Sequence, residues 1–388
     1  MNEKNFDVVI YGATGFTGKL VVEYMLKQYG NDNSISWAMA GRSHEKLLAV
    51  KEKLGVPAEI ALLTVDSEDK TSITDMVKQT KCVLTTVGPY QLYGSDLIEE
   101  CASHGTDYVD LCGEPGWMYE MIEAHSEAAK ASGARIIFSC GFDSIPFDLG
   151  VLYAQEEAIK RYGKPSTNVR GRVRVMDGEF SGGTAASLGA TMASLKVKPE
   201  LLSVLINPFS LSEGFNGPEQ APDNAPIYDE KLQTWVAPFF MAPINTKNVH
   251  RSNALMNHSY GKDFSYNEMW VSGPGDEGKA VAEMVASVNF MNDAPEPGEG
   301  PSRESREKGS YDILFCADMN EESVHVSVKG DMDPGYGSTS KMITESAICL
   351  VRECDDLVGG IYTPASSMGN KLIKRLQANA GLTFLIES

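Results

Sequence analysis

The stretch that decides the fold lies at residues 6–18, Phe-Asp-Val-Val-Ile-Tyr-Gly-Ala-Thr-Gly-Phe-Thr-Gly. A short apolar strand runs directly into three glycines spaced three residues apart, and an amphipathic helical pattern follows at once. Gly12 permits a tight turn, Gly15 leaves the backbone open to a pyrophosphate, and Gly18 lets the helix lie close to the strand. The stretch therefore predicts a dinucleotide-binding βαβ unit with phosphates at the helix N-terminus. The predicted cofactor contacts in this loop are Gly12, Thr14, Gly15, Phe16, Thr17 and Gly18.

The end of the second predicted strand indicates which dinucleotide binds. Residues 35–40 read as a strand that ends in Gly41-Arg42-Ser43. An NAD site usually has an acidic residue about 20 residues after the glycines, to bind the ribose 2′-hydroxyl. This chain instead offers the guanidinium of Arg42 and the hydroxyl of Ser43, with Lys46 one helical turn further on. Because these groups suit a 2′-phosphate, we predict NADP (NADPH) rather than NAD; the alternative is that Arg42 is a solvated residue at a helix start.

The composition excludes several classes of protein. The chain has 388 residues, enough for two or three domains, and a net charge of −19. Such a charge argues against nucleic acid and anionic lipid as partners. No apolar run reaches the roughly 18 residues of a membrane span, and the first strand leaves no room for a signal peptide. The seven cysteines form no Cys-x-x-Cys pair. We therefore expect a cytoplasmic protein with reduced thiols, no nucleic-acid partner and no integral membrane segment.

Strand and helix patterns alternate with short turns from residue 6 to residue 140. This alternation predicts an α/β fold with an N-terminal Rossmann-type, doubly wound parallel sheet, whose ligands lie at the carboxyl ends of the strands. The third strand ends at an acid, and the fourth, at residues 82–90, is closed by Gly-Pro. The residues expected at this edge are Asp66, Val87, Gly88 and Pro89 beside the cofactor, and Tyr90, Tyr93, Glu114 and Asp143 beside the substrate.

A set of motifs extends from the glycine loop to residue 150. They are Tyr11-Gly-Ala-Thr-Gly-Phe-Thr-Gly18, Ala40-Gly-Arg42, Val87-Gly-Pro-Tyr90, Asp110-Leu-Cys-Gly-Glu114 and the run from Cys140 to Gly150. With these motifs the chain resembles the saccharopine dehydrogenase-like oxidoreductases, and most of all their trans-acting enoyl reductase branch. Stretches at 297–302, 334–337 and 363–365 fit as well. The resemblance covers nearly the whole chain. It implies a second, mixed α+β domain, C-terminal helices that return to the first domain, and reduction with a nicotinamide cofactor.

The chain after residue 150 has a different pattern. Residues 169–180 alternate between apolar and polar side chains, as in a half-buried antiparallel strand. We therefore divide the chain into an NADP-binding Rossmann domain at 1–150, a mixed-sheet substrate and dimerisation domain at 151–333, and a C-terminal helical segment at 334–388 that packs back on the Rossmann domain. An edge strand of the second domain would allow a homodimer.

Two long polar loops and one apolar stretch of the second domain are candidates for covering a ligand. The loops lie at residues 207–229 and 293–310, and loops of this length are either functional lids or mobile, poorly ordered segments. The apolar stretch at residues 238–245 would cover the ligand directly.

Familiar catalytic motifs are missing from the sequence. None of the 15 tyrosines has a lysine four residues later, so the Tyr-x-x-x-Lys dyad of ketone reduction is absent. No Cys or His cluster has the spacing of metal ligands, so no metal is predicted. A Gly-x-Ser-x-Gly elbow is also absent, which argues against a hydrolase. The chemistry therefore belongs to the nicotinamide, and the protein orients and polarises the acceptor.

Each candidate catalytic residue has a structural alternative. Tyr90, with Tyr93, would donate to an enolate oxygen, or Tyr90 would pack beside the nicotinamide. Glu114 would be a general acid or base, would bind the cofactor amide, or would place a charge at a helix N-terminus. Asp143 would be catalytic, or would cap the helix that follows it.

The function implied by the resemblance is hydride transfer from NADPH to the β-carbon of an apolar α,β-unsaturated acyl group, an enoyl reductase-like reaction on a small-molecule or lipid-type substrate. Two alternatives stay open. One is a saccharopine dehydrogenase-like C–N oxidoreductase, in which a stripe of Arg170, Arg172 and Arg174 would hold an amino-acid carboxylate, although a solvated strand face explains the stripe equally well. The other is a non-catalytic NADP-binding scaffold or redox sensor.

Overall fold

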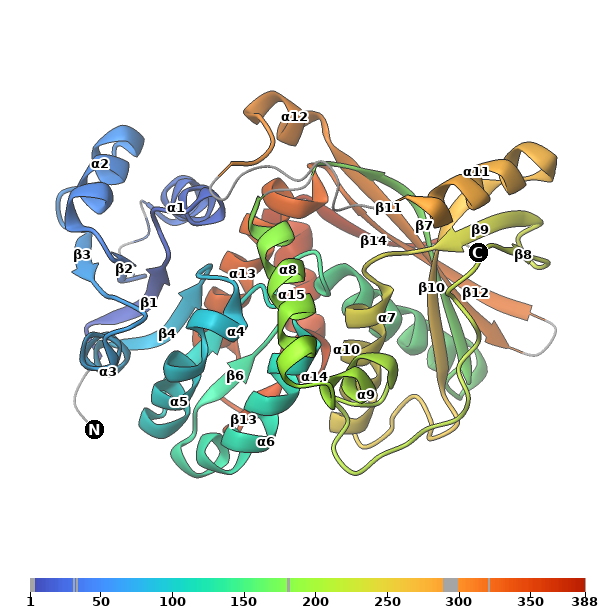
Figure 1. Ribbon diagram of the computed structural model, residues 1–388, viewed down its shortest axis with the longest axis horizontal. Coiled ribbons are helices and arrows are strands. Elements are labelled where there is room, and N and C mark those ends of the chain that lie inside the picture. The colour runs from blue at the N-terminus through green and yellow to red at the C-terminus, as the bar shows by residue number, and fades with distance from the viewer. Residues whose placement is uncertain are drawn as a thin grey trace.

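The computed structural model describes residues 4–30, 32, 34–179, 182–288, 299–319 and 322–387, without the side chains of residues 182–185. Within these ranges the chain forms two seven-stranded sheets with helices packed around them (Figure 1). Part of the predicted loop at 293–310, residues 293–298, lies outside the described residues.

The first sheet is parallel throughout and carries the glycine loop. Its strands follow the order β13-β6-β5-β4-β1-β2-β3. They are β1 (Phe6–Tyr11), β2 (Trp37–Gly41), β3 (Ala61–Thr64), β4 (Thr80–Thr85), β5 (Asp107–Val109), β6 (Arg135–Ile137) and β13 (Gly360–Tyr362). The helices between them are α1 (Phe16–Tyr29), α2 (His44–Leu54), α3 (Lys70–Gln79), α4 (Tyr90–Tyr93), α5 (Ser95–His104) and α6 (Pro115–Ser132).

The position of the central strands explains their composition. Val8 and Val9 of β1 point to opposite faces of the sheet, and both are fully buried because helices cover both faces. The strand order reverses between β1 and β4, and ligands of such sheets bind at this reversal, outside the carboxyl ends of the strands. The predicted doubly wound sheet is confirmed. The fourth strand is shorter than predicted: it ends at Thr85, and Tyr90 already begins a helix.

The second sheet is mixed, as the resemblance implies. Its order is β14-β12-β11-β7-β10-β9-β8, and only β7 and β10 pair in parallel. Its strands are β7 (Asn168–Asp177), β8 (Ile227–Asp229), β9 (Thr234–Pro238), β10 (Ser265–Gly273), β11 (Ser310–Met319), β12 (Glu322–Gly330) and β14 (Leu382–Ile386). The helices of this part are α7 (Ile145–Tyr162), α8 (Gly182–Val197), α9 (Leu201–Ile206), α10 (Ala242–Leu255), α11 (Gly275–Ser287) and α12 (Arg303–Lys308).

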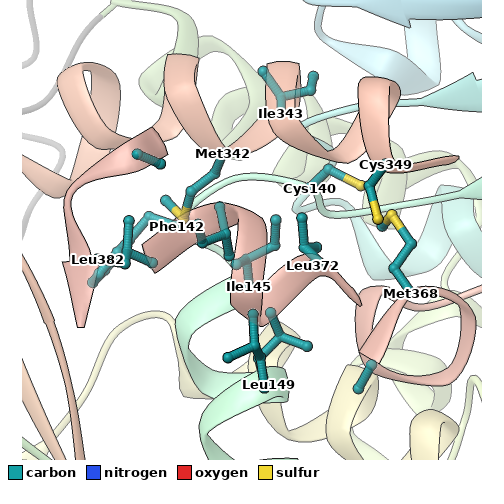
Figure 2. Close-up of a cluster of buried hydrophobic side chains, with 14 of the residues drawn as sticks. Cys140, Phe142, Ile145, Leu149, Met342, Ile343, Cys349, Met368, Leu372 and Leu382 are labelled. Carbon is teal, nitrogen blue, oxygen red and sulfur yellow. The ribbon is translucent and has the colours of Figure 1, made fainter. Parts of the chain in front are cut away.

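The C-terminal segment joins the two sheets. Helix α13 (Thr339–Glu353) packs against α1 and β4, so C-terminal helices do return to the first domain. Figure 2 shows Met342 and Cys349 of this helix lying against Phe142 and Cys140, which follow β6. The segment also contributes β13 to the first sheet and β14 to the second, which the sequence analysis did not predict. Its other elements are η1 (Pro334–Ser338), α14 (Pro364–Ser367), α15 (Gly369–Arg375) and η2 (Leu376–Ala380). The boundaries at residues 150 and 333 stay our proposed division.

Candidate functional site

The glycine loop has the geometry that a bound pyrophosphate requires. Gly12 adopts a φ of +93°, and its N–H donates to the carbonyl of Ala40 at 3.0 Å. A Cβ on Gly18 would lie 2.0 Å from the Gly12 carbonyl oxygen, so only glycine allows α1 to approach β1 this closely. The cap residue of α1 is Gly15, which offers no side-chain acceptor, and this leaves the first N–H groups of the helix for phosphate oxygens.

The edge beside β2 carries the cationic groups. Arg42 is exposed, and Ser43 caps α2 by accepting the N–H of Lys46 at 3.2 Å, which leaves its own O–H as a donor. A pocket of about 250 Å³ lies between α1 and α2. It is lined by Thr14, Lys19, Lys46, Ala49, Val50 and Lys53. Three lysines line this one pocket in a chain of net charge −19, and their positive charge has the sign that a phosphate requires.

Asp66 lies on this same edge of the sheet. Burial raises the pKa of Tyr11, at the end of β1, to about 12; the negative charge of Asp66 adds to this rise and Arg42 opposes it. The Asp66 carboxylate also accepts the N–H of Glu68 at 3.1 Å, so it turns the chain after β3. The ends of β1, β2 and β3 thus bring Tyr11, Arg42 and Asp66 together, as the parallel sheet predicts.

The loop after β4 lies against the glycine loop. A Cβ on Gly12 would lie 2.9 Å from the Val87 side chain, so Val87 closes the space beneath the first turn. The next bond, Gly88–Pro89, is a cis peptide. Helix α8 of the second half covers this loop, since Thr191 accepts a hydrogen bond from the Gln91 amide at 3.2 Å. Val87, Gly88 and Pro89 therefore lie between the glycine loop and α8, and their contact with the cofactor stays a prediction.

The structure favours a packing role for Tyr90 over oxyanion stabilisation. Its hydroxyl donates to the Thr85 carbonyl at 3.3 Å and accepts the N–H of Leu111 at 3.0 Å. The residue is 5% exposed, and burial raises the pKa of its phenol well above the usual value. Because the only O–H hydrogen is used inside the protein, Tyr90 connects the ends of β4 and β5. Tyr93 ends the same short helix and is half-buried.

The side chain of Glu114 lies at the N-terminus of α4, and not at that of α6, the helix that follows Glu114 in the sequence. The side chain is 2% exposed, and its two carboxylate oxygens accept the backbone N–H groups of Tyr90 at 3.0 Å and Gln91 at 2.8 Å. Two bonds from the first N–H groups of α4 account for both oxygens. This contact holds the Gly88–Gln91 loop in place, which favours the structural alternative for Glu114.

Asp143 has the chemistry of a proton donor. The cap residue of the following helix α7 is Ser144, so Asp143 does not cap it. Its Oδ1 atom is inaccessible to water and has no hydrogen-bond partner among the described residues. Burial raises the pKa of Asp143 to about 7. A carboxyl at the carboxyl edge of the sheet that keeps its proton near neutrality is suited to general acid catalysis.

A second buried carboxyl faces this point from the second sheet. Glu268 of β10 is fully buried; it accepts the Tyr266 O–H at 2.8 Å and the Asn245 side-chain N–H at 2.9 Å. Burial raises the pKa of Glu268 well above its usual value; the hydrogen bonds from Asn245 and Tyr266 oppose this rise, and the negative charge of Asp143 adds to it. No motif in the sequence indicates Glu268, because an acid within a strand carries none. Its apolar neighbours Met269 and Trp270 are the only local signal.

An apolar pocket of about 530 Å³ lies next to this cluster, between α9, the loop that follows it and the start of α10. The predicted covering stretch at 238–245 contributes much of its wall, and the loop at 207–229 contributes residues 208 and 220–224. Lys247 is 2% exposed in the same wall, and its ammonium donates to the carbonyls of Leu205 at 2.7 Å and Pro243 at 3.0 Å. Burial lowers the pKa of Lys247 to about 8.

The arginine stripe of β7 is already paired within the protein. Arg170 contacts Asp229 at 2.6 Å and Asp318 at 3.1 Å, and Arg172, which is 2% exposed, contacts Asp229 at 2.9 Å. Arg174 pairs with acids of β11 and the C-terminus. The stripe is therefore neither a solvated strand face nor a free carboxylate site.

Within the described ranges, no group of three His, Cys, Asp or Glu side chains is placed to hold a metal ion. The seven cysteines all lie in these ranges and are buried free thiols. None of the helices described has both the length and the apolar character needed to cross a membrane.

The glycine loop, the cationic edge and the second mixed sheet define a two-domain oxidoreductase that uses NADP. Residues 8–137 match the family model for the saccharopine dehydrogenase NADP binding domain. A Mycobacterium tuberculosis protein provisionally named as a trans-acting enoyl reductase is 37% identical over 97% of this chain and 96% of its own. The trans-acting enoyl reductase of Mycobacterium leprae is 32% identical, with the same coverage. The chain belongs to this trans-acting enoyl reductase family of saccharopine dehydrogenase-like proteins.

A solved structure supports the same fold. Apo saccharopine dehydrogenase (L-Glu forming) from Saccharomyces cerevisiae aligns with a TM-score of 0.56 at 11% identity, over 99% of this chain and 100% of that chain. The likeness at this identity concerns the arrangement of the two sheets, and not the residues of the site.

Proposed function

We propose that the protein is an NADPH-dependent reductase that saturates the activated double bond of an α,β-unsaturated acyl substrate. The observation that carries this proposal is Asp143, which follows β6 and whose buried Oδ1 atom has no hydrogen-bond partner among the described residues; burial raises its pKa to about 7. The names of the relatives support the reaction type. The proposed cofactor contacts are Gly12, Thr14, Gly15, Phe16, Thr17, Gly18, Arg42, Ser43, Asp66, Val87, Gly88 and Pro89.

The residues of the site divide the work between binding and proton transfer. When bound, NADPH supplies the hydride that adds to the β-carbon of the substrate. Tyr93 donates to the carbonyl oxygen, on which negative charge develops. Asp143 gives its proton to the α-carbon, and the resulting carboxylate takes a proton from water. Tyr90 and Glu114 position the loop between β4 and α4 and do not touch the substrate.

The two alternative functions differ from this proposal in what they require. A C–N oxidoreductase acting on an amino acid needs a cation to hold the carboxylate, and the Arg170, Arg172 and Arg174 stripe is occupied by Asp and Glu side chains. A scaffold or redox sensor would bind NADPH without turnover. Consumption of NADPH with an enoyl acceptor separates the scaffold from the reductase.

We also propose that the protein acts in the cytoplasm on a small-molecule or acyl substrate, without a nucleic-acid partner, and forms a homodimer. The net charge of −19 supports the absence of nucleic acid. Strand β14 is an edge of the second sheet, and Leu385 and Ile386 on it are 46% and 43% exposed, so a second copy can pair there. Light scattering after size-exclusion chromatography measures whether the mass is that of one chain or two.

The reaction is tested with crotonyl-N-acetylcysteamine thioester as the acceptor, by following NADPH absorbance. The wild-type protein should consume NADPH, and Asp143→Asn should lose about 100-fold or more in kcat, within the range for general acid catalysis. Glu156→Gln is the matched control, because Glu156 is also a carboxyl whose pKa burial raises, but it bonds Asn370. NADPH binding without turnover by the wild type would overturn the reductase in favour of the scaffold. An unchanged kcat in Asp143→Asn would remove Asp143 from the mechanism.

A further inference from the structure

The apolar pocket between α9 and α10 has the size and lining of a ligand site. Its volume of about 530 Å³ lies within the roughly 300–1,000 Å³ of small-molecule sites. The apolar part of the wall consists of leucine, isoleucine, proline, alanine and phenylalanine side chains from α9, Pro208, residues 221–222, the segment at 238–240 and the start of α10. Polar side chains complete the lining, as in most small-molecule sites, where a largely apolar wall takes a hydrocarbon group and a few polar groups fix its orientation.

The cation in the wall does not make the pocket an anion site. Two hydrogens of the Lys247 ammonium are bonded to the carbonyls of Leu205 and Pro243. Asp223 lines the same pocket, and its negative charge opposes that of Lys247. Because the two charges compensate, the field inside the pocket favours neither a carboxylate nor an amine, and apolar contact dominates.

One end of the pocket lies close to the proposed proton donor. Tyr266 lines the pocket, and its hydroxyl donates to Glu268 at 2.8 Å. Glu268 is in turn near enough to Asp143 for the two charges to interact. Asn245, one helical position before the pocket residue Thr246, bonds the other oxygen of Glu268. Tyr266, Asn245 and Glu268 therefore connect this end of the pocket to Asp143.

We propose that this pocket binds the hydrocarbon chain of the acyl substrate, with the reacting carbons beside Asp143 and the chain end against α9. This assignment rests on the proposed reductase function, since the double bond must lie at Asp143 for the chain to reach the pocket. Leu205 and Phe240, which both belong to the apolar wall, then limit how long a chain is accepted.

Saturated acyl-N-acetylcysteamine thioesters with 4, 6, 8 and 10 carbons test the pocket, because each probe is about two methylenes longer than the one before it. These probes carry no double bond, so calorimetry in the presence of NADP measures binding without turnover. Each methylene that enters the pocket should tighten Kd up to about fourfold, the factor that corresponds to burying one CH₂. A Kd that does not change with chain length would overturn the proposal.

Two tryptophan variants of α9 locate the effect. Leu205 lines the pocket, whereas Leu202, on the same helix, is 51% exposed and does not. Leu205→Trp should remove most of the dependence of Kd on chain length and leave the 4-carbon probe unaffected. Leu202→Trp should keep the wild-type series. Equal behaviour of the two variants would overturn the proposal, and the wild-type series decides alone if Leu205→Trp does not fold.

Binding and turnover fail separately in this design. If the wild type reduces the crotonyl thioester but shows no chain-length dependence, the pocket proposal fails and the reductase stands. If Kd depends on chain length and Leu205→Trp abolishes that dependence, but no enoyl thioester is reduced, the pocket binds acyl chains and the reductase proposal fails.

Discussion

Replacement of Glu114 by Gln separates a structural carboxylate from a catalytic one. Both oxygens of Glu114 are occupied by backbone N–H groups, those of Tyr90 and Gln91. A glutamine keeps one acceptor and turns an NH₂ group toward the other N–H, so one bond to a charged group is lost in a buried site. Such a bond contributes about 1.5–3 kcal/mol, and we expect Glu114→Gln to lower the free energy of unfolding by this amount. Glu114→Ala loses both bonds, about 3–6 kcal/mol.

Urea denaturation of the protein, followed by far-UV circular dichroism, measures this loss. Glu120→Gln is the matched control, because Glu120 lies on the same helix α6 and pairs with Lys198 at the surface. An exposed pair of this kind contributes about 0–1 kcal/mol, so the control should unfold close to the wild type. The reasoning is refuted if Glu114→Gln is as stable as Glu120→Gln but has lost turnover, because Glu114 would then act on the reaction and not on the loop.

Three further predictions concern the cofactor and the proton. Arg42→Ala should weaken NADPH binding about 10- to 150-fold in a fluorescence titration, because hydrogen bonds to a charged group contribute about 1.5–3 kcal/mol. The affinity for NADH should not change. Equal effects on both nucleotides would contradict the 2′-phosphate contact. Gly18→Ala places a Cβ 2.0 Å from the Gly12 carbonyl oxygen. It should lower the free energy of unfolding by about 1–3 kcal/mol in thermal or urea denaturation, and it should also lower the affinity for NADPH. Normal NADPH binding would show that the close approach of α1 to β1 is dispensable. The kcat of the wild type should be constant below pH 7 and fall as the pH rises above it. The reason is that burial raises the pKa of Asp143 to about 7 and the protonated carboxyl is the active form. A kcat that rises through this pH range would make Asp143 a general base instead of a general acid.

The sequence is informative where the physical signal is local. The glycine spacing, the apolar strand before it and the missing acid near Arg42 all lie within a short stretch, and each predicts its contact without knowledge of the rest of the chain. The alternation of strands and helices predicts the parallel sheet for the same reason. The positions of Gly12, Gly18 and Val87 agree with that interpretation.

The roles of Tyr90 and Glu114 depend on contacts between segments distant in sequence. Glu114 bonds residues 23 and 24 positions earlier, and the Tyr90 hydroxyl bonds the ends of two neighbouring strands. Only the register of β4 against β5 brings these groups together. Their position at the edge of the sheet predicts a catalytic role, whereas their hydrogen bonds indicate that they hold the loop after β4 in place. Glu268 was missed because its environment is created by α10 and by Asp143, which belong to other parts of the chain.

The contribution of one C-terminal segment to both sheets affects how the protein is synthesised. Strand β13 adds to the edge of β6 and strand β14 to the edge of β12, and both are made after nearly all the other strands have left the ribosome. Until then the nascent chain presents the edges of β6 and β12 without the strands that pair with them. Unpaired edges promote association with other chains. Translation that stalls before residue 360 therefore leaves both domains prone to aggregation at once.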